Sequence, residues 1–262
     1  MNKRILLTGG AGYIGSHLYV LLFNIGYKPI ILDNFSTSHG NVIQNIQKII
    51  KSDVMIHEGD VRNNKFVTKI IKDFEIESVI HLAAFKSVED SMKNPKEYSN
   101  NNLGGLRSLL EAMKDSKCEN LIFSSSATIY GNNSESPISE DSKRVSLNPY
   151  AETKIMSEDM IFDFSRKNKD FKYGILRYFN PAGAHDSGLI GEHYTDKSTN
   201  LFPIISKINK TSKGKLKIYG SDYKTHDGTP IRDFIHILDL VEGHIMSLQY
   251  IIKKKQNLII NL

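Results

Sequence analysis

Tyr150 and Lys154 have the residue types and the spacing of a proton-transfer pair. They lie four residues apart near the start of an expected helix, so their side chains share one helix face. A tyrosine with the ordinary pKa of about 10 is a poor base at neutral pH, and a neighbouring ammonium favours the phenolate. Ser126 ends the serine run 124–126, and its hydroxyl can hydrogen-bond a reacting alcohol. Together the three predict proton transfer coupled to hydride transfer at a carbinol carbon, although a Tyr-x-x-x-Lys pair alone is more often an ordinary helix surface.

A glycine pattern near the N-terminus predicts the partner for that hydride. Gly9, Gly12 and Gly15 follow an apolar stretch and open a helix-like one. Glycine permits a tight turn and a close approach of a pyrophosphate to the helix N-terminus. Asp33 ends the second apolar stretch, where a carboxylate accepts hydrogen bonds from ribose hydroxyls and repels a 2′-phosphate. The pattern favours NAD over NADP; the alternative is a simple turn with Asp33 as a helix cap.

Two further strand ends fit the same cofactor. Asp60 and Val61 follow the third expected strand, and Asp60 could hydrogen-bond an adenine amino group or equally cap the next helix at Asn63. Residues 81–86 end the fourth strand, with small side chains where a cofactor must pass. Because ligands of parallel sheets bind outside the carboxyl ends of the strands, we expect these segments to meet.

The elements that must position these residues alternate between strand and helix, which predicts an α/β protein with a doubly wound parallel sheet. Residues 1–179 would form an NAD-binding domain, 180–232 an irregular substrate-binding segment, and 233–262 a return to the first domain. Nothing follows the strand expected at 257–262, so we expect a small, truncated substrate domain. The other expected strands are 4–8, 29–33, 54–58, 78–82, 120–124 and 172–177. The expected helices are 15–23, 65–74, 95–114 and 150–167, and one more strand and one more helix are expected within 233–252.

Composition excludes several classes of protein. The chain has 262 residues, of which 40% are hydrophobic and 24% charged, as in ordinary globular proteins. The net charge of +5 comes from scattered lysines, which favours a solvated surface over a nucleic-acid site. The sequence has no apolar run long enough for a membrane span and no evident signal peptide. Its single cysteine, Cys118, excludes an intrachain disulfide. We therefore expect a cytoplasmic protein. The nine histidines lack metal-binding spacing, so no metal is expected.

The motifs together resemble the extended short-chain dehydrogenase/reductase family and, within it, the UDP-glucose 4-epimerases. The glycine segment 8–17 and the Tyr150/Lys154 pair are generic to the wider family, whereas segments 176–185 and 227–236 are much more specific to the epimerases. The resemblance spans the whole chain. It implies a Rossmann-type fold, a bound NAD, a UDP-sugar substrate and a homodimer. Family members continue beyond the position of Leu262, which again implies a truncated substrate domain.

The resemblance also implies roles for individual residues. Tyr150 would be the catalytic base, Lys154 its activator and Ser126 its hydrogen-bonding partner on the sugar. An arginine such as Arg232 suits a diphosphate, although without the resemblance an arginine beside Asp233 is more often part of a surface ion pair. The implied substrate contacts are Lys86, Ser126, Tyr150, Asn180, Asn200, Leu201, Tyr219 and Arg232. The implied NAD contacts are Gly9, Gly12, Tyr13, Ile14, Gly15, Asp33, Asn34, Phe35, Ser36, Thr37, Ser38, Asp60, Val61, Leu82, Ala83, Ala84, Lys86, Asn101, Tyr150, Lys154 and Phe179.

The implied reaction interconverts UDP-galactose and UDP-glucose in galactose metabolism. The hydride at C4 passes to NAD and returns to the opposite face of a 4-keto sugar. One alternative is another nucleotide-sugar epimerase or dehydratase of the same family, although residues 126–128 lack the acidic groups that a dehydratase needs. The other is a truncated NAD-binding protein with little or no activity.

Overall fold

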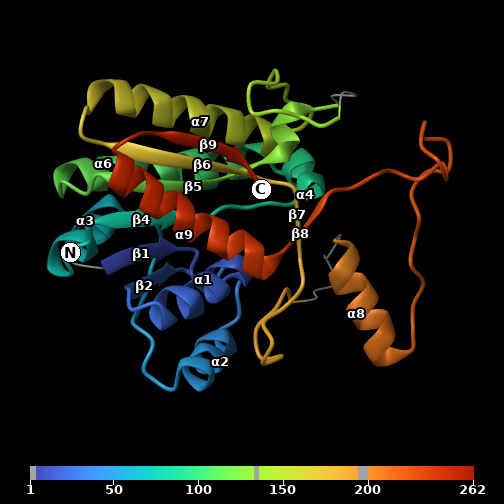
Figure 1. Cartoon of the computed structure of the whole chain (residues 1–262), viewed down its shortest axis with the longest axis horizontal. Helices are drawn as coiled ribbons and strands as arrows, with labels where there is room; N and C mark the ends of the chain where they lie inside the picture. Colours follow the sequence, from blue (N-terminus) through green and yellow to red (C-terminus); the bar gives the residue numbers. More distant parts are fainter. Residues whose placement is uncertain (1–3, 133–135, 194–199) are drawn as a thin grey trace.

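A parallel sheet of seven strands forms the centre of the computed structural model, which describes residues 4–132, 136–193 and 200–262 (Figure 1). The strand order is β3-β2-β1-β4-β5-β6-β9, and each neighbouring pair is parallel. The order reverses between β1 and β4, where such sheets bind their ligands. The topology confirms the predicted doubly wound, Rossmann-type sheet. The strands are β1 (Arg4–Thr8), β2 (Lys28–Asp33), β3 (Ile56–Glu58), β4 (Ser78–His81), β5 (Asn120–Ser126), β6 (Lys172–Tyr178) and β9 (Leu258–Asn261).

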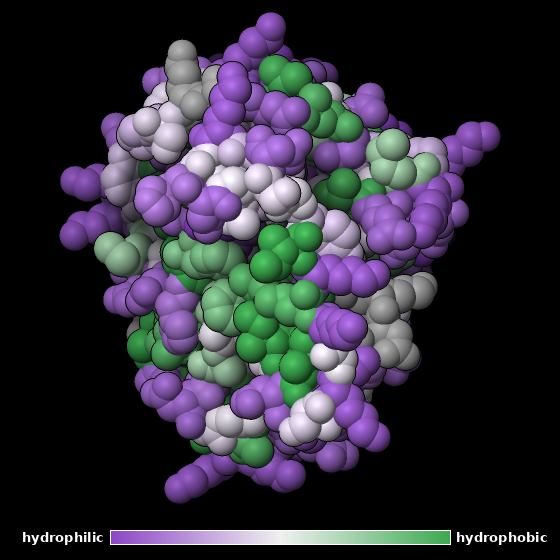
Figure 2. Space-filling view, turned by 90° about the vertical axis from the view of Figure 1, so that its right-hand side faces the viewer, coloured by the Kyte–Doolittle hydropathy of each residue, from purple (hydrophilic) through white to green (hydrophobic). Residues whose placement is uncertain are grey.

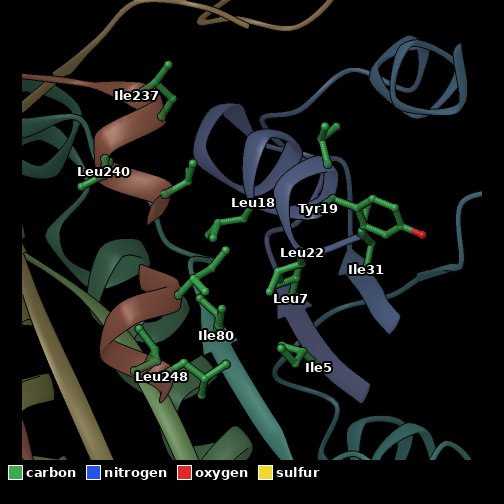
Figure 3. Close-up of a cluster of buried hydrophobic side chains, with 14 of the residues drawn as sticks. Ile5, Leu7, Leu18, Tyr19, Leu22, Ile31, Ile80, Ile237, Leu240 and Leu248 are labelled. Carbon is green, nitrogen blue, oxygen red and sulfur yellow. The ribbon is translucent and has the colours of Figure 1, made fainter. Parts of the chain in front are cut away.

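Helices cover both faces of the sheet because successive side chains of each strand point to opposite sides. In β1, Ile5 and Leu7 pack with α1, α2 and α9, whereas Leu6 packs with α3, α6 and α7. Figure 3 shows the first of these cores, where side chains of α1, the sheet and α9 meet. The helices are α1 (Tyr13–Asn24), α2 (Asn41–Ile50), α3 (Asn64–Asp73), α6 (Gly104–Asp115), α7 (Pro149–Lys167) and α9 (Ile237–Lys254).

The helix predicted over 95–114 is interrupted. α5 (Pro95–Tyr98) leads into a π-helical turn (Ser99–Leu103), and α6 follows. The side chain of Asn102 in this turn is buried and accepts a hydrogen bond from Phe85 N at 2.9 Å. Its amide nitrogen donates to Phe85 O and to Thr153 Oγ1 of α7, each at 3.1 Å. The turn therefore joins the segment after β4 to the helix that carries Tyr150, in keeping with the frequent occurrence of π-turns near functional sites.

Within the described residues, three α-helices and one short 3-10 helix (Ala127–Tyr130) fall outside the sequence prediction. α2 lies between the second and third strands, with apolar residues at helical spacing, and α4 (Val88–Lys93) is a short helix after β4. α8 (Leu201–Thr211) lies within the segment 180–232, for which we predicted irregular structure. β7 (Asn180–Ala182) and β8 (Phe234–His236) form a parallel pair that brings the two ends of this segment together.

Exposed apolar side chains gather on the side of the molecule where α8 lies (Figure 2). Phe202 of α8 packs edge-on against Phe234, with ring centroids 5.3 Å apart, yet the two residues stay 41% and 44% exposed. Ile231 is 78% exposed. Among the helices within the described ranges, none is long and apolar enough to cross a bilayer.

Candidate active site

The glycine loop between β1 and α1 has the close packing that a dinucleotide site requires. Gly9 adopts φ +71°, and a Cβ there would lie 2.7 Å from the backbone nitrogen of Ala83. A Cβ at Gly15 would lie 2.6 Å from the Cα of Gly10. α1 begins after Gly12 without a side-chain cap, and its first turn carries no acidic residue. Its leading N–H groups and the positive end of the helix dipole thus suit a pyrophosphate, and the residues present fit the group.

Asp33 holds together the loops around the glycine turn between β1 and α1. Its Oδ2 accepts a hydrogen bond from Ala11 N at 2.9 Å, and its Oδ1 accepts from Phe35 N at 2.8 Å and Ser38 Oγ at 2.9 Å. A carboxylate has about four acceptor positions, so one remains for a ribose hydroxyl. Asp33 does not cap α2, whose N-cap is Gly40. The capping alternative is therefore wrong.

Asp60 is engaged by its own neighbours. Arg62 lies 2.6 Å from its carboxylate, and Asn34 donates to it at 3.1 Å. The hydrogen bonds from Arg62 hold the pKa of Asp60 at about 2, against the opposing effect of partial burial. The N-cap of α3 is Asn63 rather than Asp60, since Asn63 accepts from Phe66 N. The alternative in which Asp60 caps this helix is therefore wrong as well.

The remaining residues implied for NAD lie mainly along the carboxyl edge of the sheet. Lys86, after β4, forms an ion pair with Glu192 at 2.9 Å. Tyr13 donates to Gly183 O at 2.7 Å and so ties α1 to the segment after β7. These residues follow β1 (Gly9, Gly12, Tyr13, Ile14, Gly15), β2 (Asn34, Phe35, Ser36, Thr37, Ser38), β3 (Val61), β4 (Leu82, Ala83, Ala84, Lys86) and β6 (Phe179), and Asn101 lies in the π-helical turn.

Ser126, Tyr150 and Lys154 come together at the carboxyl end of β5. Tyr150 and Lys154 stand on the first turns of α7, which Asn148 caps by accepting from Ala151 N at 2.9 Å. Lys154 Nζ donates to Ser124 O at 2.6 Å, and the Tyr150 hydroxyl is hydrogen-bonded to Ser126. All three side chains are at least nine-tenths buried. A hydroxyl, a phenol and an amine so placed can move a proton at one substrate oxygen.

Burial shifts the pKa of both titrating groups in the direction that favours the neutral form of each. It raises the pKa of Tyr150 to about 12, although the hydrogen bond with Ser126 opposes the rise. It lowers the pKa of Lys154 to about 8, and the charge of Glu158 opposes that fall. Lys154 Nζ lies 5.8 Å from the centre of the Tyr150 ring and is not among the groups that shift the phenol. The expectation that this ammonium lowers the pKa of the phenol is not met in the protein alone.

The other residues implied for substrate lie in the segment 180–232. Asn180 donates to Asp233 O at 2.6 Å, and Asn200 donates to Glu192 at 2.6 Å just before α8. Tyr219 is 76% exposed, and Arg232 is exposed with a hydrogen bond to Ile231 O. Among the described residues no ion pair joins Arg232 to Asp233, so that alternative is not observed. Leu201 opens α8 and is 40% exposed.

Sequence reasoning missed two buried residues close to Lys154, Glu158 and Arg177. Glu158 is fully buried on α7 and pairs with the buried Arg177 of β6 at 2.8 Å. Glu158 lies four residues after Lys154 and eight after Tyr150, so the three positions share one helix face. This spacing is the sequence signal from which Glu158 could have been found.

The fold and these contacts define a class: a Rossmann-type dinucleotide-binding protein in which a serine, a tyrosine and a lysine lie together at the carboxyl edge of the sheet. A family model described as "NAD dependent epimerase/dehydratase family" matches residues 5–262. The chain belongs to this family. Its membership confirms NAD as the cofactor and places the protein among the nucleotide-sugar epimerases and their relatives, as the motifs predicted.

Individual relatives are similar over nearly the whole chain. The UDP-glucose 4-epimerase of Dictyostelium discoideum is 43% identical over 98% of this chain and 74% of its own length. The bifunctional protein GAL10 of Pachysolen tannophilus is also 43% identical, over 97% of this chain but only 37% of that longer protein. The crystal structure of UDP-glucose-4-epimerase from Stenotrophomonas maltophila, with bound NAD and formylated UDP-arabinopyranose, superimposes with a TM-score of 0.96 at 37% identity and covers 99% of this chain and 77% of that one.

Proposed function

We propose that this protein interconverts UDP-galactose and UDP-glucose by reversible oxidation at C4 of the sugar. The observation that carries the proposal is the buried grouping of Ser126, Tyr150 and Lys154 at the carboxyl edge of the sheet. Relatives named UDP-glucose 4-epimerase support the choice of substrate, and one similar structure holds NAD with a UDP-sugar.

NAD, when bound, supplies the acceptor and donor of hydride. The turn from Gly9 to Gly15 and the leading amides of α1 would hold its pyrophosphate, since α1 begins there without a side-chain cap or an acidic residue in its first turn. The free acceptor position of Asp33 would take a ribose hydroxyl. Lys154, held by Ser124 O, would present its amine to the second ribose.

Ser126 and Tyr150 would hold the 4-hydroxyl of the sugar between them. Tyr150 takes the hydroxyl proton as the carbinol is oxidised and returns it when the 4-keto sugar is reduced from the opposite face. With a pKa near 12, the phenol needs added positive charge to serve as a base at neutral pH. Lys154 is not among the groups that shift the phenol in the protein alone, so the added charge would come from the oxidised cofactor, and the phenol would become competent only in the loaded protein.

The nucleotide would be gripped more firmly than the sugar, because the sugar must turn over without escaping. We assign Arg232 to the diphosphate, since a guanidinium matches phosphate oxygens in pairs. The other residues assigned to the UDP-sugar are Lys86, Asn180, Asn200, Leu201 and Tyr219. A second copy of the chain is proposed as partner in a homodimer.

Conversion of UDP-galactose by the purified protein, followed by chromatography of the nucleotide sugars, tests the proposal. We expect protein that retains NAD after purification and converts UDP-galactose to UDP-glucose, with conversion lost in Tyr150→Phe and retained in the control Tyr250→Phe. Conversion of a different UDP-sugar alone would indicate another epimerase of the family. Retained NAD without any turnover would indicate an NAD-binding protein, and activity that survives Tyr150→Phe would remove the mechanism.

A further inference from the structure

Glu158 forms the centre of a buried polar cluster beside the catalytic group. Its Oε1 accepts from Ser125 Oγ at 2.6 Å and from Arg177 Nε at 3.0 Å. Its Oε2 accepts from Arg177 at 2.8 Å and from Arg144 at 3.3 Å. Four donors therefore occupy a carboxylate that is 0% exposed. A fully satisfied buried carboxylate of this kind fixes the positions of the elements that it joins.

Those elements are the ones that carry the catalytic side chains. Ser125 lies between Ser124, whose carbonyl receives the amine of Lys154, and Ser126. α7 is thus fastened to the end of β5 by two bonds at consecutive residues, one from Lys154 and one to Glu158. Arg177 adds a link to β6, the strand that pairs with β5. A small slide of α7 would separate Tyr150 from Ser126.

We propose that Glu158 is a positioning residue, whose buried carboxylate holds α7 against the ends of β5 and β6 and so sets the distance between Tyr150 and Ser126. The inference rests on the proposed function only in that these two residues act on the same substrate hydroxyl. A displacement of about 1 Å in such a pair can cost about 100-fold in rate.

Glu158 also acts on Lys154 through its charge. Burial lowers the pKa of Lys154, and Glu158 is the group that opposes this. Replacing the carboxylate by an amide would remove that opposition and leave the cation of Arg177 unpaired nearby, so the pKa of Lys154 would fall further. The titratable or charged groups around the amine are Tyr150 and Glu158 on α7, His81 on β4, Arg177 and Tyr178 on β6, and Arg144 beyond Glu158.

The primary test measures the pKa of Lys154 by carbon-13 NMR of lysine-labelled protein, with the resonance assigned by its loss in Lys154→Arg. In Glu158→Gln we expect the proton affinity of Lys154 to fall at least about tenfold. The matched control is Asp159→Asn, which removes one negative charge from the next residue of α7, where Asp159 pairs with Arg144 at the surface. We expect the control to leave the pKa of Lys154 unchanged. This measurement needs no turnover, so it is independent of the proposed function.

Kinetics test the positioning. We expect Glu158→Gln to lower kcat about 100-fold with KM within about twofold, and Glu158→Asp to recover part of the loss. Because Glu158→Gln could impair folding by isolating Arg177, Ser125→Ala provides a milder variant that removes only the bond to β5. We expect it to lower kcat with little change in the unfolding midpoint. A kcat within about twofold of wild type in folded Glu158→Gln or Ser125→Ala would overturn the positioning role. A Lys154 pKa unchanged in Glu158→Gln would overturn the effect of the Glu158 charge on the amine.

Discussion

Lys154 provides a sharp test of the electrostatics of the site. Its amine is buried, with 3% of the residue exposed, and burial lowers its pKa from 10.5 to about 8. In the unfolded chain the pKa returns to its ordinary value. At about 1.4 kcal/mol per tenfold change in proton affinity, this difference corresponds to about 3 kcal/mol between the two states.

The sign follows from which state binds the proton more tightly. Between pH 8 and pH 10.5 the unfolded chain keeps the proton on Lys154 while the folded protein releases it, so this residue makes the folded state more stable as pH rises. Below pH 8 both states carry the charge, and the full cost of burying it is present. Replacing Lys154 by methionine removes this pH dependence.

Urea unfolding of wild type and Lys154→Met, at intervals from pH 7 to pH 10, measures the effect. We expect the free energy of unfolding of the wild type, relative to the variant, to increase by about 2.5 kcal/mol over this range. The lost hydrogen bond to Ser124 O shifts the variant by a nearly constant amount and does not affect the slope. The exposed Lys167 lies on the same helix, so Lys167→Met is the matched control and should give a pH-independent difference. A pH-independent difference for Lys154→Met as well would refute the buried-amine interpretation.

Three further changes test the glycine turn and the contacts around it. Gly15→Ala places a Cβ 2.6 Å from the backbone of the preceding turn, so we expect the purified variant to lose its NAD. Gly40→Ala is the control, because a Cβ at Gly40 would have nothing within 4 Å, and we expect it to keep NAD. Equal NAD content in the two variants would contradict the packing argument. Asp33→Asn exchanges a charged acceptor for a neutral amide, and we expect NAD to bind about tenfold more weakly and NADP to be tolerated better, as measured by calorimetric titration of protein stripped of cofactor. Tyr13→Phe removes the hydrogen bond to Gly183 O, so we expect faster amide hydrogen exchange in the segment after β7 and a loss of about 1 kcal/mol in the free energy of unfolding. Unchanged exchange would show that this hydrogen bond does not hold the segment in place.

The sheet could be predicted from local pattern because buried parallel strands are short, apolar and regularly spaced. The strand predicted at 4–8 has the same bounds as β1, and the other strands differ from prediction by a few residues at their ends. The glycine turn was also predictable, since strand, turn and helix follow one another in sequence. For the same reason Tyr150 and Lys154 could be placed together: their four-residue spacing on one helix is a local property.

What could not be predicted depends on contacts distant in sequence. Asn102 interrupts a helix because its side chain bonds to Phe85 and Thr153, and neither partner is visible in the local pattern of residues 95–114. Glu158 had the right spacing, but its importance comes from Arg177 on β6, a residue brought to it only by the fold. α8 was missed because its apolar residues remain partly exposed and follow an irregular stretch.

Tyr150 shows why an inference from residue type alone can have the wrong sign. The sequence places an ammonium four residues away, which suggests a phenol of lowered pKa. In the fold, however, the amine is drawn to Ser124 O, while burial acts on the phenol and raises its pKa to about 12. The same burial makes any positive charge brought into the site more effective, because the local dielectric is low. If Tyr150 acts as the proposed base, a phenol that burial keeps neutral would gain its basicity only when a cation binds beside it, so the proposed reaction would depend on cofactor loading.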